Sequence, residues 1–336
     1  MSVSVFGVSR QGVATRLALR WSALVGGRAI CLQSQSGAAA PHVSKRTLRS
    51  QKVHRCSVSV AQLGQQTNNT NSVYSNPELY DRAFSLRDFA EEVDFLNTIF
   101  KSCVKTGPGS FLELGCGPAR HTAQLQLRTH AKASALDNVP QMLEYARTVA
   151  EEAGASVHFV CEDMRSFTLQ EPADMAFMLL GTFSHMLDNA SALQCLRSIH
   201  AVLKPTGKLV LELSHPTDIF DGSLIQEDEW DDADNRPSGP GVPGELAIQY
   251  GSSGDEFDAI DQVIMRTVQI YEADNQKCMQ RKLREVVPQR IYTYQEMNLL
   301  ASMSGFKLAA AYGDMQIDLS IRAEDAARMV LVLERL

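Results

Sequence analysis

The chain contains 336 residues, is 44% hydrophobic and carries a formal net charge of −7. The first 77 residues hold nine Lys or Arg and no Asp or Glu, so they contribute +9 and leave −16 for the rest. Because nucleic acids are bound by clustered positive charge, the acidic body argues against a nucleic-acid partner. No segment reaches the roughly 20 apolar residues that a membrane span requires, so we expect no membrane insertion.

The N-terminal segment is rich in Ser and Ala as well as in basic residues, which is the composition of an organellar transit peptide. Residues 53–57, Val-His-Arg-Cys-Ser, resemble the cleavage region of chloroplast transit peptides. We therefore expect residues 1–60 to direct the protein to the chloroplast stroma, with the mitochondrial matrix as the alternative. A disordered basic tail is the plainer interpretation. Residues 61–76 are polar, lack apolar periodicity and are predicted to be a linker.

The seven cysteines are dispersed and form no Cys-x-x-Cys pair. No histidine set lies near them, so we expect neither a disulfide framework nor a metal site. The residues after the leader suffice for one large α/β domain with an insertion. In this domain, apolar residues recur at three- and four-residue spacing from Leu79 to Phe100, which predicts one amphipathic helix over residues 78–100.

A glycine-rich turn follows the first predicted strand. Residues 111–121 read Phe-Leu-Glu-Leu-Gly-Cys-Gly-Pro-Ala-Arg-His, which indicates a strand, a turn and the start of a helix. Gly115 and Gly117 can adopt positive φ and have no Cβ, so a ligand can lie against the backbone at the helix start. A dinucleotide fingerprint from Gly115 requires glycine at position 120, and Arg120 therefore disfavours NAD.

This turn resembles the first motif of the class I S-adenosylmethionine (SAM) methyltransferases, read as E/D-x-G-C-G. Glu113, Gly115, Cys116 and Gly117 match that motif, and Ala119 replaces its usual third glycine. The resemblance implies an α/β fold with a Rossmann-like, seven-stranded sheet flanked by helices. It also implies that SAM is the cofactor and that the four matching residues contribute to its site.

The resemblance also assigns a role to the helix predicted before the glycine turn. Tyr74, Tyr80 and Asp81 form a Tyr…Tyr-Asp pattern like that of a helix that covers the cofactor as a lid in this family. Tyr80 is thus expected to contact SAM. A capping helix with ordinary tyrosines is the alternative.

The second predicted strand, residues 133–136, ends at Asp137 and Asn138. This end should lie beside the glycine turn, where a carboxylate can accept hydrogen bonds from both ribose hydroxyls of the ligand. We expect Asp137, with Asn138 beside it, to bind the cofactor in this way. The alternative role for Asp137 is to cap the helix that begins near Pro140.

The third predicted strand, residues 157–161, is followed by Asp163 and Met164. The resemblance places an acidic residue after this strand at the adenine amino group, with the next backbone N–H facing the ring. Asp163 and Met164 take these two roles. Without the resemblance, Asp163 would be a polar loop residue only.

Two histidines follow core strands at the edge where open α/β sheets bind ligands. His185 comes shortly after residues 174–180, an apolar run typical of a strand covered on both faces. His215 follows the fifth predicted strand, residues 208–213, whose Lys-Pro-Thr-Gly entry resembles a late methyltransferase signature. A histidine pKa near 6.5 suits a general base, so we expect His185 first and His215 second in that role. For each, a structural polar role is the alternative.

The segment after the fifth strand, residues 214–290, does not follow the preceding βαβ pattern. Its acidic and Pro/Gly-rich part, residues 226–244, is predicted to be a mobile lid, with an inert surface loop as the alternative. Residues 261–271 and 277–287 alternate in polarity around an Asp-Asn turn, which predicts an antiparallel hairpin beside the substrate cleft.

The last segment, residues 291–336, should return to the core sheet. A helix over residues 293–304 is predicted to end at Gly305, and residues 306–312 and 328–333 are predicted to be the final strands. An antiparallel last strand is the family pattern.

We therefore expect a SAM-dependent methyltransferase that methylates an O or N atom of a small molecule and releases S-adenosylhomocysteine (SAH). The chain lacks the N/D-P-P-Y sequence and the paired-glutamate loop, which argues against nucleobase, glutamine and arginine acceptors. Two alternatives stay open: a catalytically silent SAM-binding protein in organellar complex assembly, and an NAD-dependent oxidoreductase. The sequence does not indicate the acceptor or the oligomeric state.

Overall fold

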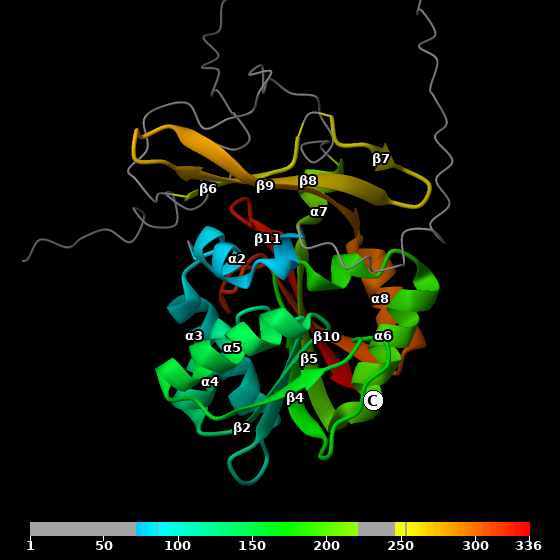
Figure 1. Cartoon of the computed structure of the whole chain (residues 1–336). Coiled ribbons are helices and arrows are strands. Elements are labelled where there is room, and N and C mark those ends of the chain that lie inside the picture. The colour runs from blue at the N-terminus through cyan, green and yellow to red at the C-terminus, as the bar shows by residue number, and fades with distance from the viewer. Residues whose placement is uncertain (1–71, 86, 221–245, 253) are drawn as a thin grey trace, which may run out of the picture. The chain divides into compact units, whose positions relative to one another are not determined.

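The computed structural model describes residues 72–85, 87–220, 246–252 and 254–336 (Figure 1). The expected transit peptide and mobile lid lie outside these residues. The described elements, with η for a 3₁₀ helix, are η2 (Val73–Ser75), α2 (Pro77–Ala83), α3 (Phe89–Cys103), β1 (Ser110–Leu114), α4 (Arg120–Thr129), β2 (Lys132–Asp137), α5 (Pro140–Ala153), β3 (Val157–Cys161), β4 (Ala173–Met178), η3 (Thr182–His185), α6 (Asn189–Val202), β5 (Leu203–Ser214), α7 (Pro216–Phe220), β6 (Leu246–Tyr250), β7 (Phe257–Asp258), β8 (Val263–Ala273), β9 (Met279–Arg290), α8 (Tyr294–Met303), β10 (Phe306–Tyr312) and β11 (Arg328–Arg335).

The larger sheet has seven strands in the order β10-β11-β5-β4-β1-β2-β3. The strands from β5 to β3 pair in parallel, whereas β11 is antiparallel to both β5 and β10. Helices α3, α4 and α5 contact the sheet on one side, and α6 and α8 on the other (Figure 1). The predicted Rossmann-like methyltransferase fold, including its antiparallel last strand, is therefore confirmed.

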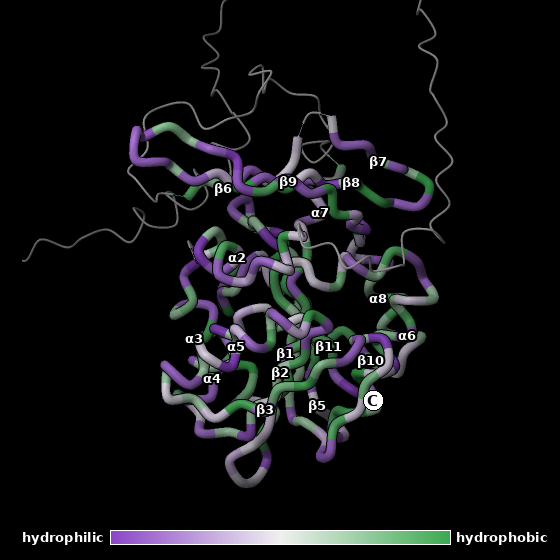
Figure 2. Tube along the Cα trace, viewed as in Figure 1, coloured by the Kyte–Doolittle hydropathy of each residue, from purple (hydrophilic) through white to green (hydrophobic). Residues whose placement is uncertain are grey.

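The two faces of this sheet build two separate hydrophobic clusters. Phe111 and Phe177 point toward α3, whereas their neighbours Leu112 and Ala176 belong to the cluster under α6 and α8. Both phenylalanines are almost fully buried, and burial of such a side chain stabilises the fold by about 1.5–3 kcal/mol. Strands buried on both faces lack polar alternation, and those of the large sheet are coloured largely as hydrophobic in Figure 2.

The helix predicted over residues 78–100 is two helices, so that prediction is wrong. The first helix, α2, ends at Ala83, and Asp88 starts α3 by accepting a hydrogen bond from the Glu91 N–H at 3.1 Å. An aspartate in this position satisfies a helix-start N–H that would otherwise have no partner. The apolar spacing continues across the break between α2 and α3. It therefore does not reveal that Asp88 caps a new helix in place of one continuous helix.

The predicted linker also needs correction, because its last residues are ordered. Val73 lies in η2 and is 2% exposed, and its N–H donates to Glu285 Oε2 at 2.6 Å. The described structure therefore begins before Pro77, and this segment is fastened to β9, more than 200 residues away.

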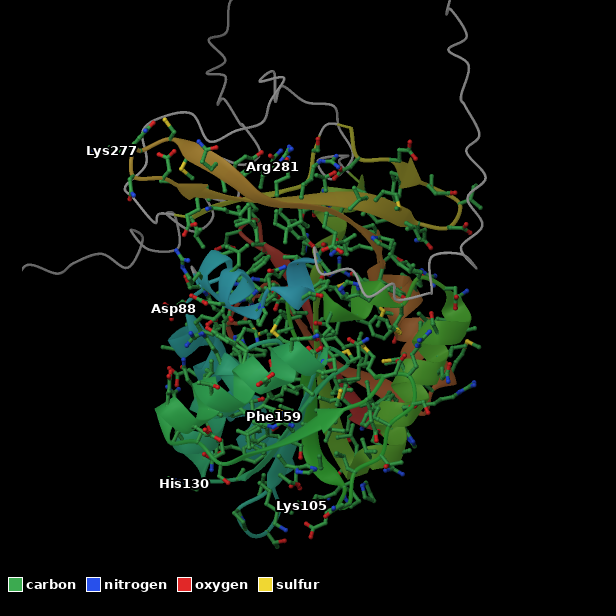
Figure 3. The ribbon with its side chains drawn as sticks, in the orientation of Figure 1. Asp88, Lys105, His130, Phe159, Lys277 and Arg281 are labelled. Atoms are coloured by element: carbon green, nitrogen blue, oxygen red, sulfur yellow. The ribbon has the colours of Figure 1, made fainter. Side chains whose placement is uncertain are left out.

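The insertion forms a second, antiparallel sheet of four strands. Its β8–β9 hairpin confirms the predicted one, and the Asp274 side chain accepts hydrogen bonds from the N–H groups of Gln276 and Cys278 in the turn. Lys277 in this turn has φ +63° (Figure 3). Strands β6 and β7, which the sequence did not predict, pair with β8. Val268 and Ile270 on one face of β8 pack against the η2–α2 segment.

Helix α6 shows how the insertion meets the main domain. Its N-cap is Asp188, which accepts from the Ser191 N–H at 2.7 Å, so the next residue, Asn189, is not needed as a cap. Asn189 instead accepts a hydrogen bond from Arg290 Nη2 of β9 at 2.7 Å. The insertion sheet is therefore attached both to the N-terminal segment and to the chain that follows β4.

No helix among the described residues is long and apolar enough to cross a membrane. Within the same residues, no group of three or more His, Cys, Asp or Glu side chains is arranged to hold a metal ion. The cysteines that the structure describes are free thiols.

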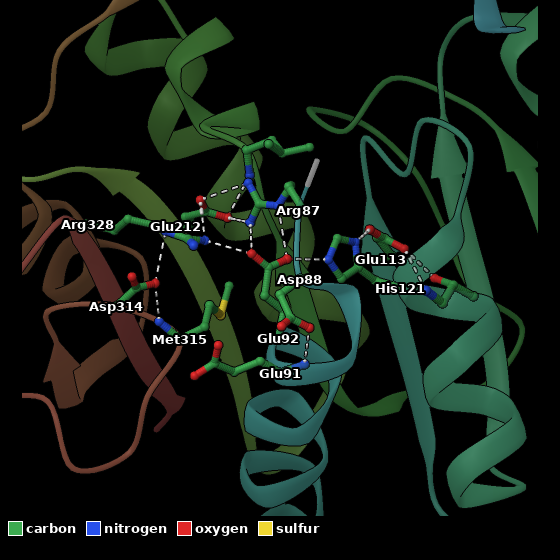
Figure 4. Close-up of polar contacts among 12 residues, drawn as sticks. Arg87, Asp88, Glu91, Glu92, Glu113, His121, Glu212, Asp314, Met315 and Arg328 are labelled. Carbon is green, nitrogen blue, oxygen red and sulfur yellow. Dashed lines mark hydrogen bonds and ion pairs between the residues drawn. The ribbon is translucent and has the colours of Figure 1, made fainter. Parts of the chain in front are cut away.

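A buried ion-pair network connects the N-terminal segment with the large sheet (Figure 4). Arg87, between α2 and α3, contacts Glu212 Oε2 of β5 at 2.9 Å and Glu92 Oε1 of α3 at 2.7 Å. Arg328 of β11 binds the same two glutamates at 2.9 and 3.2 Å. Both glutamates are less than one-tenth exposed. The network thus joins three segments that are distant in sequence: the start of α3 with the residues before it, β5 and β11.

The network keeps both glutamates ionised. Burial by itself raises the pKa of Glu92, but a hydrogen bond from His121 and the charge of Arg87 outweigh it and hold the pKa far below its usual range. Burial likewise opposes ionisation of Glu212, and the charges of Arg87 and Arg328 lower its pKa. Removing one partner would leave the remaining buried charges uncompensated.

We predict that Glu212→Gln lowers the free energy of unfolding by about 3 kcal/mol, because it leaves the half-buried Arg87 and Arg328 under-paired. Urea unfolding at pH 7 measures this change. The matched control is Glu171→Gln, which removes a carboxylate that is 68% exposed and paired with Lys132 on the surface. The control should leave stability unchanged. Equal effects of the two substitutions would contradict a structural role for the network.

The lowered pKa values of Glu92 and Glu212 determine how the stability of the fold depends on pH. Both folded-state pKa values lie below the unfolded value of about 4.3, so this stabilisation is present at pH 7 and is lost as pH falls below about 4.3. Glu212→Gln should therefore lose less stability than the wild type between pH 5 and pH 3.

Candidate active site

The glycine turn after β1 has the backbone that the sequence predicted. Gly115 and Gly117 have φ of +61° and +51°, and Ala119 adopts the same left-handed region. An added Cβ at Gly115 would overlap the Thr182 side chain of η3, so glycine is required there for packing. At Gly117 an added Cβ would lie 3.6 Å from the ring of Tyr80. The aromatic ring of α2 thus lies over the second glycine of the turn.

Asp137 lies at the end of β2, beside this turn. Its Oδ2 accepts from the Gly117 N–H at 3.1 Å and its Oδ1 from the Val139 N–H at 3.0 Å. Burial raises the pKa of this carboxyl. Helix α5 begins at Pro140 with Val139 as its N-cap, so the alternative role of Asp137 as that cap is not observed. A carboxylate oxygen accepts more than one hydrogen bond, so Asp137 can also hold a pair of ribose hydroxyls. Asn138 is exposed next to it.

Glu113 and Cys116 support the turn from within the core. Glu113 is 4% exposed and accepts from both the N–H and the hydroxyl of Thr122 in α4, at 3.1 and 2.5 Å. Burial raises the pKa of Glu113 and of the Cys116 thiol. The Cys116 N–H donates to Leu136 O at 2.9 Å. These contacts fasten β1 to α4 and to β2, so both residues shape the cofactor site through the backbone.

Asp163 and Met164 follow β3 at the same edge of the sheet. Arg165 donates to Asp163 from its Nε and its backbone N–H, at 3.0 and 2.8 Å, and these hydrogen bonds lower the Asp163 pKa. The Asp163 side chain is 38% exposed, so its carboxylate is accessible to a ligand. Met164 is half-buried against the core. Both residues therefore occupy positions compatible with an adenine site.

Helix α2 is fastened over the turn through Asp81. This buried carboxylate accepts from Arg120 Nε and Nη2, both at 2.5 Å, and from the Tyr145 hydroxyl at 2.8 Å. Arg120, which disfavours NAD in the sequence, therefore holds the lid helix on α4, and Tyr145 holds it on α5. Burial raises the pKa of Tyr80, and neighbouring Tyr250 and Asp137 add to the effect. The Tyr80 hydroxyl thus stays protonated above the glycine turn.

His185 ends η3, directly after the carboxyl end of β4. Its Nε2 lies 3.1 Å from the Tyr74 hydroxyl, and the two rings meet edge-on with centroids 5.7 Å apart. Burial lowers the pKa of His185, which keeps the imidazole neutral at pH 7. Its Nδ1 has no hydrogen-bond partner in the described part of the chain. When Nε2–H donates to Tyr74, Nδ1 keeps a lone pair that can accept a proton.

Tyr74 is the site residue that sequence reasoning missed. It lies in the segment predicted to be linker, and only the Tyr…Tyr-Asp pattern pointed to it. Its ring is 5.9 Å from that of Tyr80, and burial raises its pKa, with Tyr80 and Tyr250 adding to the effect. Three tyrosines and His185 are thus brought together from η2, α2, β6 and η3.

His215 is not available as a base, which contradicts its predicted role. Its Nδ1 accepts from the Thr217 N–H at 3.2 Å, and its Nε2–H donates to Ile321 O at 2.9 Å. Both ring nitrogens are occupied and the side chain is buried. His215 therefore links the end of β5 to the loop before β11.

Comparison with known proteins agrees with this geometry. Residues 111–207 match a family described as methyltransferase domain. A SAM-dependent methyltransferase from Clostridium acetobutylicum is similar in structure, with a TM-score of 0.62 and 14% identity over 78% of this chain and 98% of that one. A comparison with curated proteins finds no match.

Two further similar structures are sugar-modifying enzymes. The SAM-bound amino pentose methyltransferase CalS10 from Micromonospora echinaspora, involved in calicheamicin biosynthesis, has a TM-score of 0.53 and 17% identity, covering 81% of this chain and 100% of that one. The sugar N-methyltransferase KedS8 from Streptoalloteichus sp. has a TM-score of 0.51 and 18% identity, covering 92% of this chain and 99% of that one.

Residues 111–207 are therefore a methyltransferase domain, and the fold that contains them is that of the class I SAM-dependent methyltransferases. The domain match supports SAM as its cofactor. The residues present fit SAM, because Asp137, Asp163 and the open backbone at Gly117 lie at one edge of the sheet. Nothing in this arrangement supports the NAD-dependent alternative.

We predict that SAM and SAH, but not NAD, raise the midpoint of thermal unfolding of the full chain. A ligand at 100 times its Kd adds about 2.7 kcal/mol by mass action, which shifts the midpoint by a few degrees. Asp137→Ala should abolish the shift, because the ribose hydroxyls lose their acceptor. Glu144→Ala, at an exposed position of α5, is the control and should keep it. A shift with NAD alone would overturn the assignment of the cofactor.

Proposed function

We propose that the protein transfers the methyl group of SAM to an O or N atom of a small organic molecule and releases SAH. The observation that carries this proposal is a half-buried, neutral His185 at the end of β4, held by Tyr74 and with an Nδ1 that has no partner among the described residues. Strand β9 of the insertion sheet contacts both η3 and η2, the elements that carry this pair, which favours an enclosed acceptor site. The sugar-modifying neighbours support an acceptor of similar size.

When bound, SAM supplies an electrophilic methyl group on its sulfonium sulfur. Asp137 then holds the ribose hydroxyls, and Tyr80 covers the turn at Gly117, so the donor is fixed in one position. Holding donor and acceptor about 3 Å apart in line contributes much of the rate enhancement. His185 accepts the proton that a hydroxyl acceptor must lose, and Tyr74 holds the imidazole ring and its tautomer.

The role of His185 depends on the acceptor atom. A hydroxyl must lose its proton as the new bond forms, whereas a neutral amine already has a lone pair and loses its proton afterwards. The half-buried base therefore favours an O acceptor, or an amine whose proton must be removed within an enclosed site.

We predict that His185→Asn lowers kcat by about 10²–10⁴-fold with little effect on SAH binding, because only proton removal is lost. The measurement is SAH release in a panel of hydroxylated and amino acceptors. His158→Asn, an exposed histidine on β3, is the control and should be fully active. A His185→Asn protein as active as the wild type on every accepted substrate would contradict the base assignment.

The pH profile gives an independent readout. Only neutral His185 can accept a proton, and burial lowers its pKa. Wild-type kcat should therefore decrease as the pH is lowered, with a midpoint below about 6.5. This acid limb should be absent from His185→Asn. SAH binding without SAH release for every acceptor tested would instead support the catalytically silent alternative.

We also propose that residues 1–60 direct the protein to the chloroplast stroma, on the basis of their basic, Ser-rich and acid-free composition. A fusion of these residues to a fluorescent protein should accumulate in the stroma of plant cells. Accumulation in the mitochondrial matrix would favour the alternative compartment, and fluorescence left in the cytosol would contradict a transit peptide.

A further inference from the structure

The insertion sheet carries a polar group on the same face that packs against the N-terminal segment. In β8, Arg266 and Val268 are two residues apart and therefore share a face, and Val268 packs in the cluster that contains Tyr74 and Tyr80. Tyr250 of β6 lies opposite Val268, and Gln289 of β9 lies opposite Ile264 on the same face. Arg266 thus faces the side on which the tyrosines and His185 gather.

Arg266 is unusually poorly paired for a buried cation. It is 7% exposed, and its Nε has no hydrogen-bond partner in the described part of the chain. The guanidinium lies over the Tyr250 ring, 5.6 Å from its centroid. Burying a guanidinium donor without an acceptor is costly, because it loses water without gaining a hydrogen bond.

The nearest acidic group does not satisfy this cation. Asp255 Oδ2 lies 3.9 Å from Arg266 Nη1, at the outer limit of an ion pair. The Asp255 carboxylate already accepts from the backbone N–H groups of Ser252 and Thr267, at about 3 Å. Its orientation is therefore set by the turn before β7, and no hydrogen bond from the Arg266 guanidinium to another described residue is formed.

The surroundings of Arg266 are shaped to hold the guanidinium in place. Gly251 has φ +104°, and an added Cβ there would lie 2.8 Å from Arg266 Nη1. Tyr250, over which the guanidinium lies, accepts a hydrogen bond from Gln289 Nε2 at 2.5 Å. Gly251 leaves space for the guanidinium, and the Tyr250 ring packs against it. Together they position the guanidinium at the end of β6.

The position of Arg266 beside the tyrosines and His185 bears on the chemistry of the methyl acceptor. This inference rests on the function proposed above. We propose that Arg266 recognises an anionic oxygen group, a carboxylate or a phosphate, on the small molecule that is methylated. The planar guanidinium matches both groups with two parallel N–H···O bonds. The neighbouring Tyr74, Tyr80 and Tyr250 rings would then pack against the apolar part of the same molecule.

The test uses the full chain saturated with SAH and three probes of similar shape: phenyl phosphate, benzoate and the neutral benzyl alcohol. Calorimetric titration should show binding of at least one anion and weaker binding of benzyl alcohol. Arg266→Gln should raise the Kd of that anion at least tenfold, and Arg266→Lys should raise it less, because lysine keeps the charge and lacks the fork.

Arg281→Gln is the matched control. Arg281 is an exposed arginine of β9 that donates to Gln269, on the opposite face of the same hairpin (Figure 3). Its substitution should leave anion binding unchanged. Binding of phenyl phosphate alone would identify a phosphate group on the acceptor, and binding of benzoate alone a carboxylate. No anion binding by the wild type, or equal binding by Arg266→Gln, would overturn the proposal.

SAH binding separates this failure from failure of the proposed function. If the wild type does not bind SAH, the methyltransferase proposal fails first. If it binds SAH but no anion, only the role of Arg266 fails. Retained SAH binding shows that each variant is folded. If Arg266→Gln does not bind SAH, the Kd of the anion for Arg266→Lys decides the test.

Discussion

Two buried glutamates, Glu92 and Glu212, connect the elements that carry the candidate active site. They share the guanidinium groups of Arg87 and Arg328, which connects α3 with β5 and β11. Glu212 also accepts from the Leu180 N–H at 2.9 Å, just before the 3₁₀ helix that carries His185. The same network therefore fixes the N-terminal segment and the candidate base on one sheet. An apolar core could join these elements, but it would not fix their positions as directionally as hydrogen-bonded charges do.

The cofactor side of the site depends on glycine and arginine for reasons that differ from those in the sequence motif. Gly115 is needed because Thr182 fills the space of a side chain, so the turn is packed against η3. Arg120 excludes a dinucleotide fingerprint and at the same time binds Asp81, which holds α2 over the turn. The residue that departs from the dinucleotide motif thus also supplies the contact between α4 and α2.

Local signals predicted most of the fold. The third strand has the expected bounds and the following prediction of a helix start at Pro140 is confirmed, because strand propensity and a proline at the helix start act within a few residues. The place of Asp137 at the end of the second strand followed for the same reason. The β8–β9 hairpin followed from alternation and an Asp-Asn turn.

What the sequence did not reveal depends on distant contacts. Tyr74 and His185 are 111 residues apart, and Arg87 and Glu212 are 125 apart, so no local pattern pairs them. The break between α2 and α3 was missed because apolar spacing continues through it. His215 was misassigned because its partner, Ile321 O, comes from a loop 106 residues away. Burial and pairing, which decide whether a histidine can act as a base, are properties of the folded chain.

The candidate cofactor site lies at the ends of β1, β2 and β3, beside the η2–α2 segment. Hydrogen exchange of the full chain, measured by mass spectrometry with and without saturating SAH, tests this arrangement most directly. We predict protection in residues 73–81, 113–119, 137–139 and 162–165, and none in residues 295–308 of α8 and β10. Protection absent from the glycine turn, or confined to other parts of the described chain, would contradict the site.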